Sequence, residues 1–256
     1  MFFNTQDISL YYEKHGIGNK TILILPGWGN TRETFHYIIN YFKENYTIYI
    51  IDYPGFGNSP IPKNTLTIYD YTNLIKDFMT ELNIINPIII AHSFGGRIAS
   101  LLTGYYKEKI DQLILIDVAG IKPRKTLFQK LKQTTYKILK RMIKCFKKLK
   151  QKELEQKLLK LFASTDYQNL PPSMRQTFKN IVNEDLKYYF SYIESETLIL
   201  WGKKDTSTPL KDAYKINNSI KDSALIIFPE GNHFSYLQYP LLTCKIISEF
   251  IKNKNT

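Results

Sequence analysis

Cysteine and histidine are scarce in this sequence. The two cysteines, Cys145 and Cys244, stand 99 positions apart and form no metal or redox motif, which argues against a disulfide framework. The four histidines do not have the spacing of metal ligands. We therefore expect neither a metal site nor another cofactor.

The sequence also lacks a long hydrophobic run. Its first residues, MFFNTQDISLYY, do not combine a basic segment with an apolar one, so they do not resemble a signal peptide. The strongest apolar stretch, residues 84–91, contains Asn86 and Pro87 and is far shorter than the roughly 20 residues that cross a bilayer. These absences predict a soluble, cytoplasmic protein.

Positive charge is concentrated in one segment. The 256 residues carry a net charge of +12, but residues 122–160 hold fifteen Lys or Arg against two acidic residues, Glu153 and Glu155. The rest of the chain is therefore close to neutral. With 43% hydrophobic and 23% charged residues, the composition is that of a folded protein, and the length suits one domain with an insertion.

Short apolar runs rich in β-branched residues alternate with helical patterns. Runs of this length suit strands buried on both faces, as in a parallel sheet. The expected strands are residues 8–12, at an edge, and residues 21–25, 46–51, 87–91, 112–116, 197–201 and 224–228. The expected helices are residues 33–44, 69–82, 94–106, 209–219 and 240–252. This order predicts the α/β class, with a mostly parallel central sheet and helices on both faces.

The alternation stops at Gly120 and resumes near Glu196. We interpret residues 1–120 and 196–256 as the core and residues 121–195 as a helical insertion. Because the insertion follows a strand, it would cover a crevice at the carboxyl ends of the sheet.

The insertion shows apolar residues at helical spacing. They are Leu127, Leu131, Ile138, Met142, Phe146 and Leu149, continued by Leu154, Leu158, Leu161 and Phe162. Pro171 and Pro172 break the pattern, and a further helix is expected over residues 173–189.

The most informative string is Ala91-His92-Ser93-Phe94-Gly95, where a buried strand runs directly into a helix. A serine at so sharp a turn needs small neighbours, and Ala91 and Gly95 stand two positions before and after it. The turn lifts the Ser93 hydroxyl towards the helix N-terminus, where free N–H groups favour developing negative charge. Ser93 is therefore the candidate nucleophile.

This string resembles the nucleophile elbow of the α/β-hydrolase superfamily, Gly-x-Ser-x-Gly, with alanine in place of the first glycine. Residues 26–29, PGWG, resemble the family's oxyanion loop, although proline stands where histidine is usual. The resemblance implies that the backbone N–H groups of Trp28 and Phe94 form the oxyanion hole. Asp52 lies in a loop similar to the family's Asp-x-x-Gly-x-Gly-x-Ser motif, and we expect it to hold that turn without a catalytic role.

A serine hydroxyl needs a base to remove its proton, and the base needs an acid to orient it. His233 follows the last expected strand in a loop that resembles the family's catalytic histidine loop. Asp205 follows the penultimate strand, so that the order Ser93, Asp205, His233 is the family's. Asp117, after an earlier strand, is the rival acid, since some relatives carry theirs there. His92 adjoins the serine at a tight turn and is expected to pack or hydrogen-bond below it.

The resemblance implies a serine hydrolase that cleaves a carboxylic ester through an acyl-enzyme. Trp28, Phe94, Arg97 and Phe234 are expected to line its pocket. Two alternatives for the role of this site stay open, and a third concerns the basic segment. One is carbon–carbon cleavage or elimination on the same fold, since Arg97 resembles an arginine of menaquinone-pathway lyases and would bind a carboxylate, although an arginine on a helix face is more often solvated. The other is a module that only binds a ligand.

The basic segment, residues 122–160, lies in an insertion that resembles the family's helical cap. Its charge suits an acidic partner: an acyl-carrier protein, an anionic membrane surface or a substrate carboxylate. The third alternative function is that of an interfacial, lipase-like protein whose basic cap docks on lipid. The competing interpretation is a solvated face in a lysine-rich chain. No nucleic-acid partner is expected, because the sequence contains no recognised module for one.

Overall fold

The computed structural model describes residues 1–122, 127–143, 148–162 and 165–253. Its centre is an eight-stranded sheet in the order β1-β2-β4-β3-β5-β6-β7-β8. The strands are β1 (Phe2–Asn4), β2 (Ser9–His15), β3 (Lys20–Leu25), β4 (Tyr46–Asp52), β5 (Ile88–His92), β6 (Leu113–Ile116), β7 (Thr197–Gly202) and β8 (Ser223–Phe228).

The six strands from β4 to β8 in the sheet order are parallel to one another, whereas β1 pairs antiparallel with β2 and β2 pairs antiparallel with β4. The predicted α/β class with a mostly parallel sheet is therefore confirmed. The expected edge strand is β2, but the unforeseen short strand β1 pairs with its outer side, so that β1 forms the edge instead.

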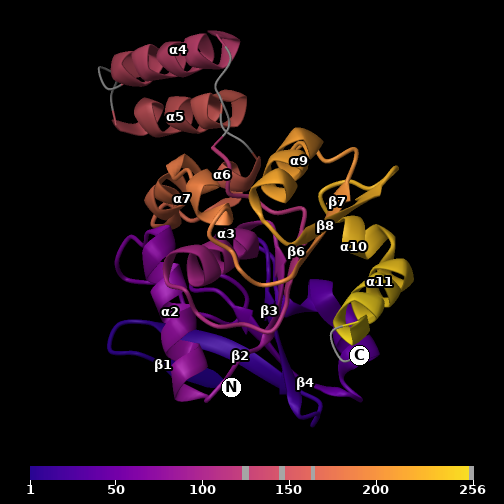
Figure 1. Ribbon diagram of the computed structural model, residues 1–256. Helices are drawn as coiled ribbons and strands as arrows, with labels where there is room; N and C mark the ends of the chain where they lie inside the picture. Colours follow the sequence, from indigo (N-terminus) through magenta and orange to yellow (C-terminus); the bar gives the residue numbers. More distant parts are fainter. Residues whose placement is uncertain (123–126, 144–147, 163–164, 254–256) are drawn as a thin grey trace.

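Helices cover both faces of the sheet (Figure 1). They are η1 (Arg32–Phe35), α1 (His36–Phe42), α2 (Ile68–Glu81), α3 (Phe94–Ser100), the π-helical turn η2 (Leu101–Tyr105), α9 (Leu210–Ser219), α10 (Ser235–Gln238) and α11 (Pro240–Asn253). The helix expected over residues 94–106 is thus α-helical only in its first two turns and continues with wider π geometry.

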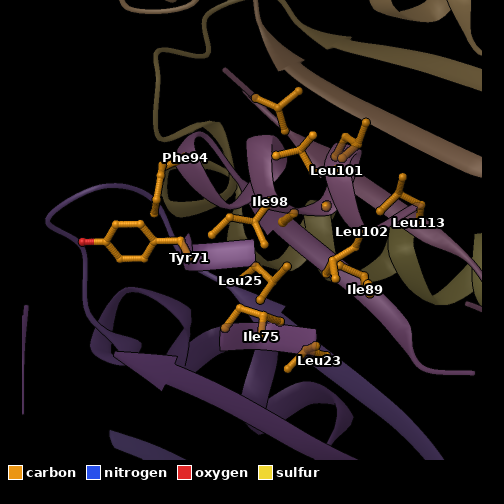
Figure 2. Close-up of a cluster of buried hydrophobic side chains, with 14 of the residues drawn as sticks. Leu23, Leu25, Tyr71, Ile75, Ile89, Phe94, Ile98, Leu101, Leu102 and Leu113 are labelled. Atoms are coloured by element: carbon orange, nitrogen blue, oxygen red, sulfur yellow. The ribbon is translucent and has the colours of Figure 1, made fainter. Parts of the chain in front are cut away.

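Alternate residues of each central strand enter two separate cores. Leu23 and Leu25 of β3 pack on the side of α2 and α3, whereas Ile22 and Ile24 pack on the side of α1 and α11. Both faces are buried, which explains the continuous apolar runs in the sequence. Figure 2 shows the first core, in which side chains from β3, β5 and β6 pack among those of α2, α3 and η2: Leu23, Leu25, Ile89, Leu113, Tyr71, Ile75, Phe94, Ile98, Leu101 and Leu102.

Local side chains also define helix ends. The hydroxyl of Thr67 accepts a hydrogen bond from the Asp70 amide at 3.2 Å, and the Asp70 carboxylate accepts one from the Thr67 amide at 2.7 Å. This reciprocal capping box satisfies two amides that would otherwise lack partners, so α2 begins at Ile68.

In the described residues between β6 and β7 there are five helices: α4 (Leu127–Ile143), α5 (Lys148–Phe162), α6 (Thr165–Asn169), α7 (Met174–Asn183) and α8 (Lys187–Phe190). In Figure 1, α4 and α5 form a hairpin farthest from the sheet, and α6 and α7 lie between this hairpin and the core. Of the predicted apolar stripe, Phe146 falls outside the described residues, as does Cys145.

The prediction of a single helix over residues 173–189 is wrong, because the structure has two helices there, α7 and α8. The chain leaves the helical conformation at Glu184, whose ψ is 132°. The Glu184 carbonyl accepts a hydrogen bond from Arg97 Nη1 at 3.0 Å, and the Leu186 amide donates to the Gly120 carbonyl at 2.8 Å. These bonds to the core replace helical ones, so tertiary contacts outweigh the local helical pattern.

Candidate active site

Ser93 stands at the turn between β5 and α3 in a strained conformation, with φ 47° and ψ −107°. Few non-glycine residues adopt such a positive φ, and the strain is typical of functional turns. The turn brings α3 against β3: a Cβ on Gly95 would lie 2.0 Å from the carbonyl oxygen of Leu25. The sequence therefore needs glycine at position 95, while Ala91 fits within the buried strand.

His233 joins Ser93 to Asp205, although the three residues lie on loops after different strands. The Nε2 atom of His233 is 2.9 Å from the Ser93 hydroxyl, and its Nδ1 atom is 2.8 Å from Asp205 Oδ2. The Asp205 side chain is fully buried, whereas the His233 ring is 19% exposed. This arrangement allows the imidazole to accept the serine proton while the carboxylate fixes its tautomer.

Hydrogen bonds from His233 and from its own loop favour the ionised form of Asp205. Burial alone would raise its pKa, but the hydrogen bond and electrostatic attraction of the His233 ring, together with bonds from Thr208, hold the pKa below its ordinary value. The Thr208 hydroxyl lies 2.5 Å from Asp205 Oδ2 and 3.3 Å from His233 Nδ1. The amides of Ser207 and Thr208 donate to Asp205 Oδ1 at 2.7 and 2.9 Å. Sequence reasoning missed Thr208, although its position three residues after an aspartate is typical of such turns.

Asp117, the rival acid, has different partners. Its carboxylate accepts hydrogen bonds from the Gly202 amide at 2.7 Å and from the Ser235 hydroxyl at 2.5 Å. It thus links the strand before Asp205 to the helix after His233, but no hydrogen bond joins it to the histidine ring. Burial raises the pKa of Asp117 to about 6, although the bonds from Ser235 and Gly202 oppose the rise.

The proposed oxyanion donors lie beside the serine. In the described part of the chain, the backbone N–H groups of Trp28 and Phe94 donate to no other group. Their side chains pack edge to face, with ring centroids 5.2 Å apart. Asp52 holds the neighbouring loop as expected, since it accepts hydrogen bonds from the amides of Arg32 and Asn58 at 3.3 and 3.0 Å.

A cavity of about 730 Å³ opens above Ser93 and His233. All four predicted pocket residues line it: Trp28, Phe94, Arg97 and Phe234. Sequence reasoning missed further lining residues from the insertion and from α9, among them Leu170, Phe178, Ile181, Val182 and Asp212. Phe178, Ile181 and Val182 recur at helical spacing, but nothing in the sequence shows which surface such a face would meet.

No three His, Cys, Asp or Glu side chains gather as a metal site within the described ranges. In the same ranges, no helix combines the length and the apolar character that crossing a membrane requires.

The model of the α/β-hydrolase fold family matches residues 20–165, which is more than half of the chain. The chain belongs to the α/β-hydrolase family. The resemblance inferred from the elbow and its accompanying loops is therefore confirmed.

Two curated relatives match the hydrolase along nearly its whole length. The pimeloyl-[acyl-carrier protein] methyl ester esterase of Wigglesworthia glossinidia brevipalpis is 26% identical over 255 residues, covering 94% of this chain and 96% of the relative. The 2-hydroxy-6-oxononadienedioate/2-hydroxy-6-oxononatrienedioate hydrolase 1 of Pseudomonas putida is 22% identical over 268 residues, covering 96% and 92%. The solved structure of an esterase from Exiguobacterium antarcticum has a TM-score of 0.74 at 22% identity and covers 96% of each chain. By its family and these relatives, the hydrolase is an enzyme.

Arg97 of the hydrolase is buried at the cavity, 5% exposed, so the solvated helix-face interpretation of this arginine is wrong. Burial lowers the pKa of Arg97 to about 10, against the opposing effect of Asp185 and Glu184. Apart from the bond to the Glu184 carbonyl, its N–H groups have no partner among the described residues. The cavity wall therefore includes a cation with free donors.

Proposed function

We propose that the hydrolase cleaves carboxylic esters, with Ser93 as nucleophile, His233 as base and Asp205 as the acid that orients the base. The observation that carries this proposal is the position of His233, within hydrogen-bond distance of both Ser93 and Asp205. Nucleophile, base and orienting acid are the three groups that acyl transfer by a serine requires.

In the first half of the reaction, Ser93 Oγ forms a bond to the ester carbonyl carbon while its proton passes to His233 Nε2. The tetrahedral intermediate then breaks its bond to the leaving oxygen, and His233 gives that oxygen the proton, so that an alcohol departs. In the second half, water attacks the acyl-enzyme and gives a proton to His233. Collapse of this second intermediate releases the acid and returns the proton to Ser93.

The negative charge of both intermediates would be held by the amides of Trp28 and Phe94. Both N–H groups lack partners in the described chain, as donors kept for a ligand would. The Phe94 amide also begins α3, where the helix dipole favours negative charge. Removing one such donor typically costs about 10²–10³ in turnover.

We further propose that residues 121–195 act as a cap over the core formed by residues 1–120 and 196–256. Leu170, beside α6, and Phe178 on α7 contribute to the cavity wall from this segment. The ring of Phe178 also packs on Trp28, with centroids 5.5 Å apart. The cap would exclude water from one side of the substrate and select its shape.

The substrate class that we propose is an acyl ester whose apolar part fits the cavity between Trp28, Phe94 and Phe234. One relative is named for a methyl ester of an acyl-carrier protein, which supports an acyl ester as substrate. An acidic partner at residues 122–160 fits the charge of that segment. We place this enzyme in the cytoplasm as part of the same proposal.

Covalent labelling by a fluorophosphonate tests the nucleophile, and a series of p-nitrophenyl esters tests the reaction. We expect labelling of the native enzyme at Ser93 and loss of labelling in His233→Ala, with His36→Ala as a control, because His36 is exposed and bonds only to the Glu33 carbonyl. A native enzyme that neither reacts with the probe nor turns over any ester would instead support a module that only binds a ligand.

A second candidate function is carbon–carbon hydrolysis or elimination in an anionic substrate at the same site. The free donors of buried Arg97 favour it, because a cation with unpaired N–H groups in a cavity suits a carboxylate. One relative is named as a hydrolase of dioates. Turnover of such a substrate, with no turnover of esters of any chain length, would favour this function over ester hydrolysis.

A further inference from the structure

The outer face of α4 exposes large apolar side chains. Leu131, Ile138 and Met142 are 65%, 55% and 59% exposed. At 3.6 residues per turn, these positions lie within about 40° of one another around the helix. They form one continuous stripe, which we name the outer stripe. Single apolar residues scattered over a surface are common, but a contiguous exposed patch is typical of an interaction site.

The outer stripe is distinct from the face by which α4 packs on its neighbour. That inner face contains Tyr136, whose ring lies 5.8 Å from the ring of Phe162 on α5, and Ile143, which is buried. In Figure 1, α4 is the outermost helix of the molecule and runs along the top of the hairpin. A flat surface could therefore contact the whole length of the outer stripe without meeting the core.

Cations border the outer stripe on both sides. Lys137 and Arg141 lie about 80–120° from Leu131 in one direction, and Lys132 lies about 100° away in the other. The sequence of α4 contains no acidic residue. Lys137 and Arg141 form no ion pair with another described residue, so both charges remain available. The ammonium of Lys132 instead lies 5.7 Å from the centre of the Phe162 ring on α5.

We propose that the outer stripe of α4 docks on an anionic lipid surface. Helices that lie in a membrane interface combine an apolar stripe with lysine and arginine at its borders, whose aliphatic stems reach along the surface while the charges meet lipid phosphates. A solvated face would not need three large apolar residues in one line. Docking would place α6 and α7, which line the cavity, on the same side of the molecule as the lipid (Figure 1).

Co-sedimentation with vesicles tests this surface. We expect the full-length enzyme to bind vesicles of mixed phosphatidylglycerol and phosphatidylcholine, and to bind phosphatidylcholine alone much more weakly. Neutralising two bordering cations in Lys137→Gln/Arg141→Gln should weaken binding about 30-fold. Removing apolar contact in Leu131→Gln/Met142→Gln should weaken it about tenfold or more.

Matched controls carry the same changes on other parts of the surface. Lys221→Gln/Lys245→Gln removes two exposed charges, and Ile17→Gln/Ile85→Gln replaces two side chains that are 94% and 76% exposed. Both should bind vesicles like the native protein. All substituted positions are exposed, and circular dichroism of each variant verifies that it is folded.

Equal binding to neutral and anionic vesicles, or binding to neither, would overturn the proposal. So would capture of the enzyme by an acidic acyl-carrier protein in the absence of vesicle binding, because the basic surface would then recognise a protein. The outer stripe contains no residue of the proposed catalytic site. Turnover of soluble p-nitrophenyl acetate should therefore remain unchanged in every variant, which separates this test from that of the proposed function.

Discussion

The Nε2 atom of His92 lies 2.8 Å from the carbonyl oxygen of His233, so the residue before the serine holds the backbone of the proposed base. A carbonyl oxygen only accepts, and Nε2 of His92 must therefore carry a proton. Burial lowers the pKa of His92 to about 3, helped by the neighbouring His233, so the ring stays neutral at physiological pH.

This contact predicts that His92→Leu lowers kcat about tenfold, because it leaves a buried carbonyl without its donor and loosens the loop of His233. His92→Gln should retain most activity, since its amide can donate at a similar position. Steady-state kinetics and thermal unfolding of both variants check the prediction. Equal activity of the leucine and glutamine variants would mean that the hydrogen bond does not position the base.

The two buried aspartates should respond differently to removal of charge. Asp205→Asn is expected to lower kcat by roughly 10⁴, because the amide no longer stabilises the correct tautomer of His233. Asp117→Asn should lower kcat about tenfold or less, since Asp117 bonds to Gly202 and Ser235 and not to the ring. Kinetics with a soluble ester measure both, and a larger loss in Asp117→Asn would identify Asp117 as the orienting acid.

Asp117 should also make stability depend on pH. Its pKa of about 6 in the folded protein lies above the value of an exposed aspartate, so the native state binds the proton more tightly. The stabilisation is fully present below about pH 4 and is lost as the pH rises through about 6, with a change on the order of 3 kcal/mol. Urea unfolding of the native protein and Asp117→Asn, from about pH 4 to about pH 8, measures it. A constant difference between the two proteins over this range would refute the prediction.

Arg97 should discriminate between anionic and neutral substrates. Arg97→Gln is expected to raise KM about tenfold or more for an ester with a free carboxylate at its far end, because a charge-assisted hydrogen bond is lost. KM for the neutral ester of the same length should change about threefold or less, through the lost bond to the Glu184 carbonyl. Arg97→Lys retains the charge and serves as the control. Equal changes for the two esters would assign Arg97 to structure alone.

Much of the fold was predictable because it follows from local pattern. The buried strands correspond to apolar runs in the sequence, and the alternation of these runs with helical patterns predicted the parallel sheet. The strand-to-helix turn around Ser93 was predictable because a sharp turn needs small residues beside it in the chain. The contact that excludes a side chain at Gly95 is, however, with the Leu25 carbonyl, 70 positions away. The break at Glu184 was not predictable, because it depends on a hydrogen bond from Arg97, 87 positions away.

The sequence by itself determined the α/β class, the turn that exposes Ser93, and the order of the serine, aspartate and histidine along the chain. Each of these can be predicted from residue types and their spacing along the chain. Only the tertiary structure decided that Asp205 rather than Asp117 meets His233, that Arg97 is buried at the cavity, and that the outer stripe of α4 is exposed to solvent. Each of these depends on which distant segments pack together, and a single hydrophobic or charged pattern does not specify its partner.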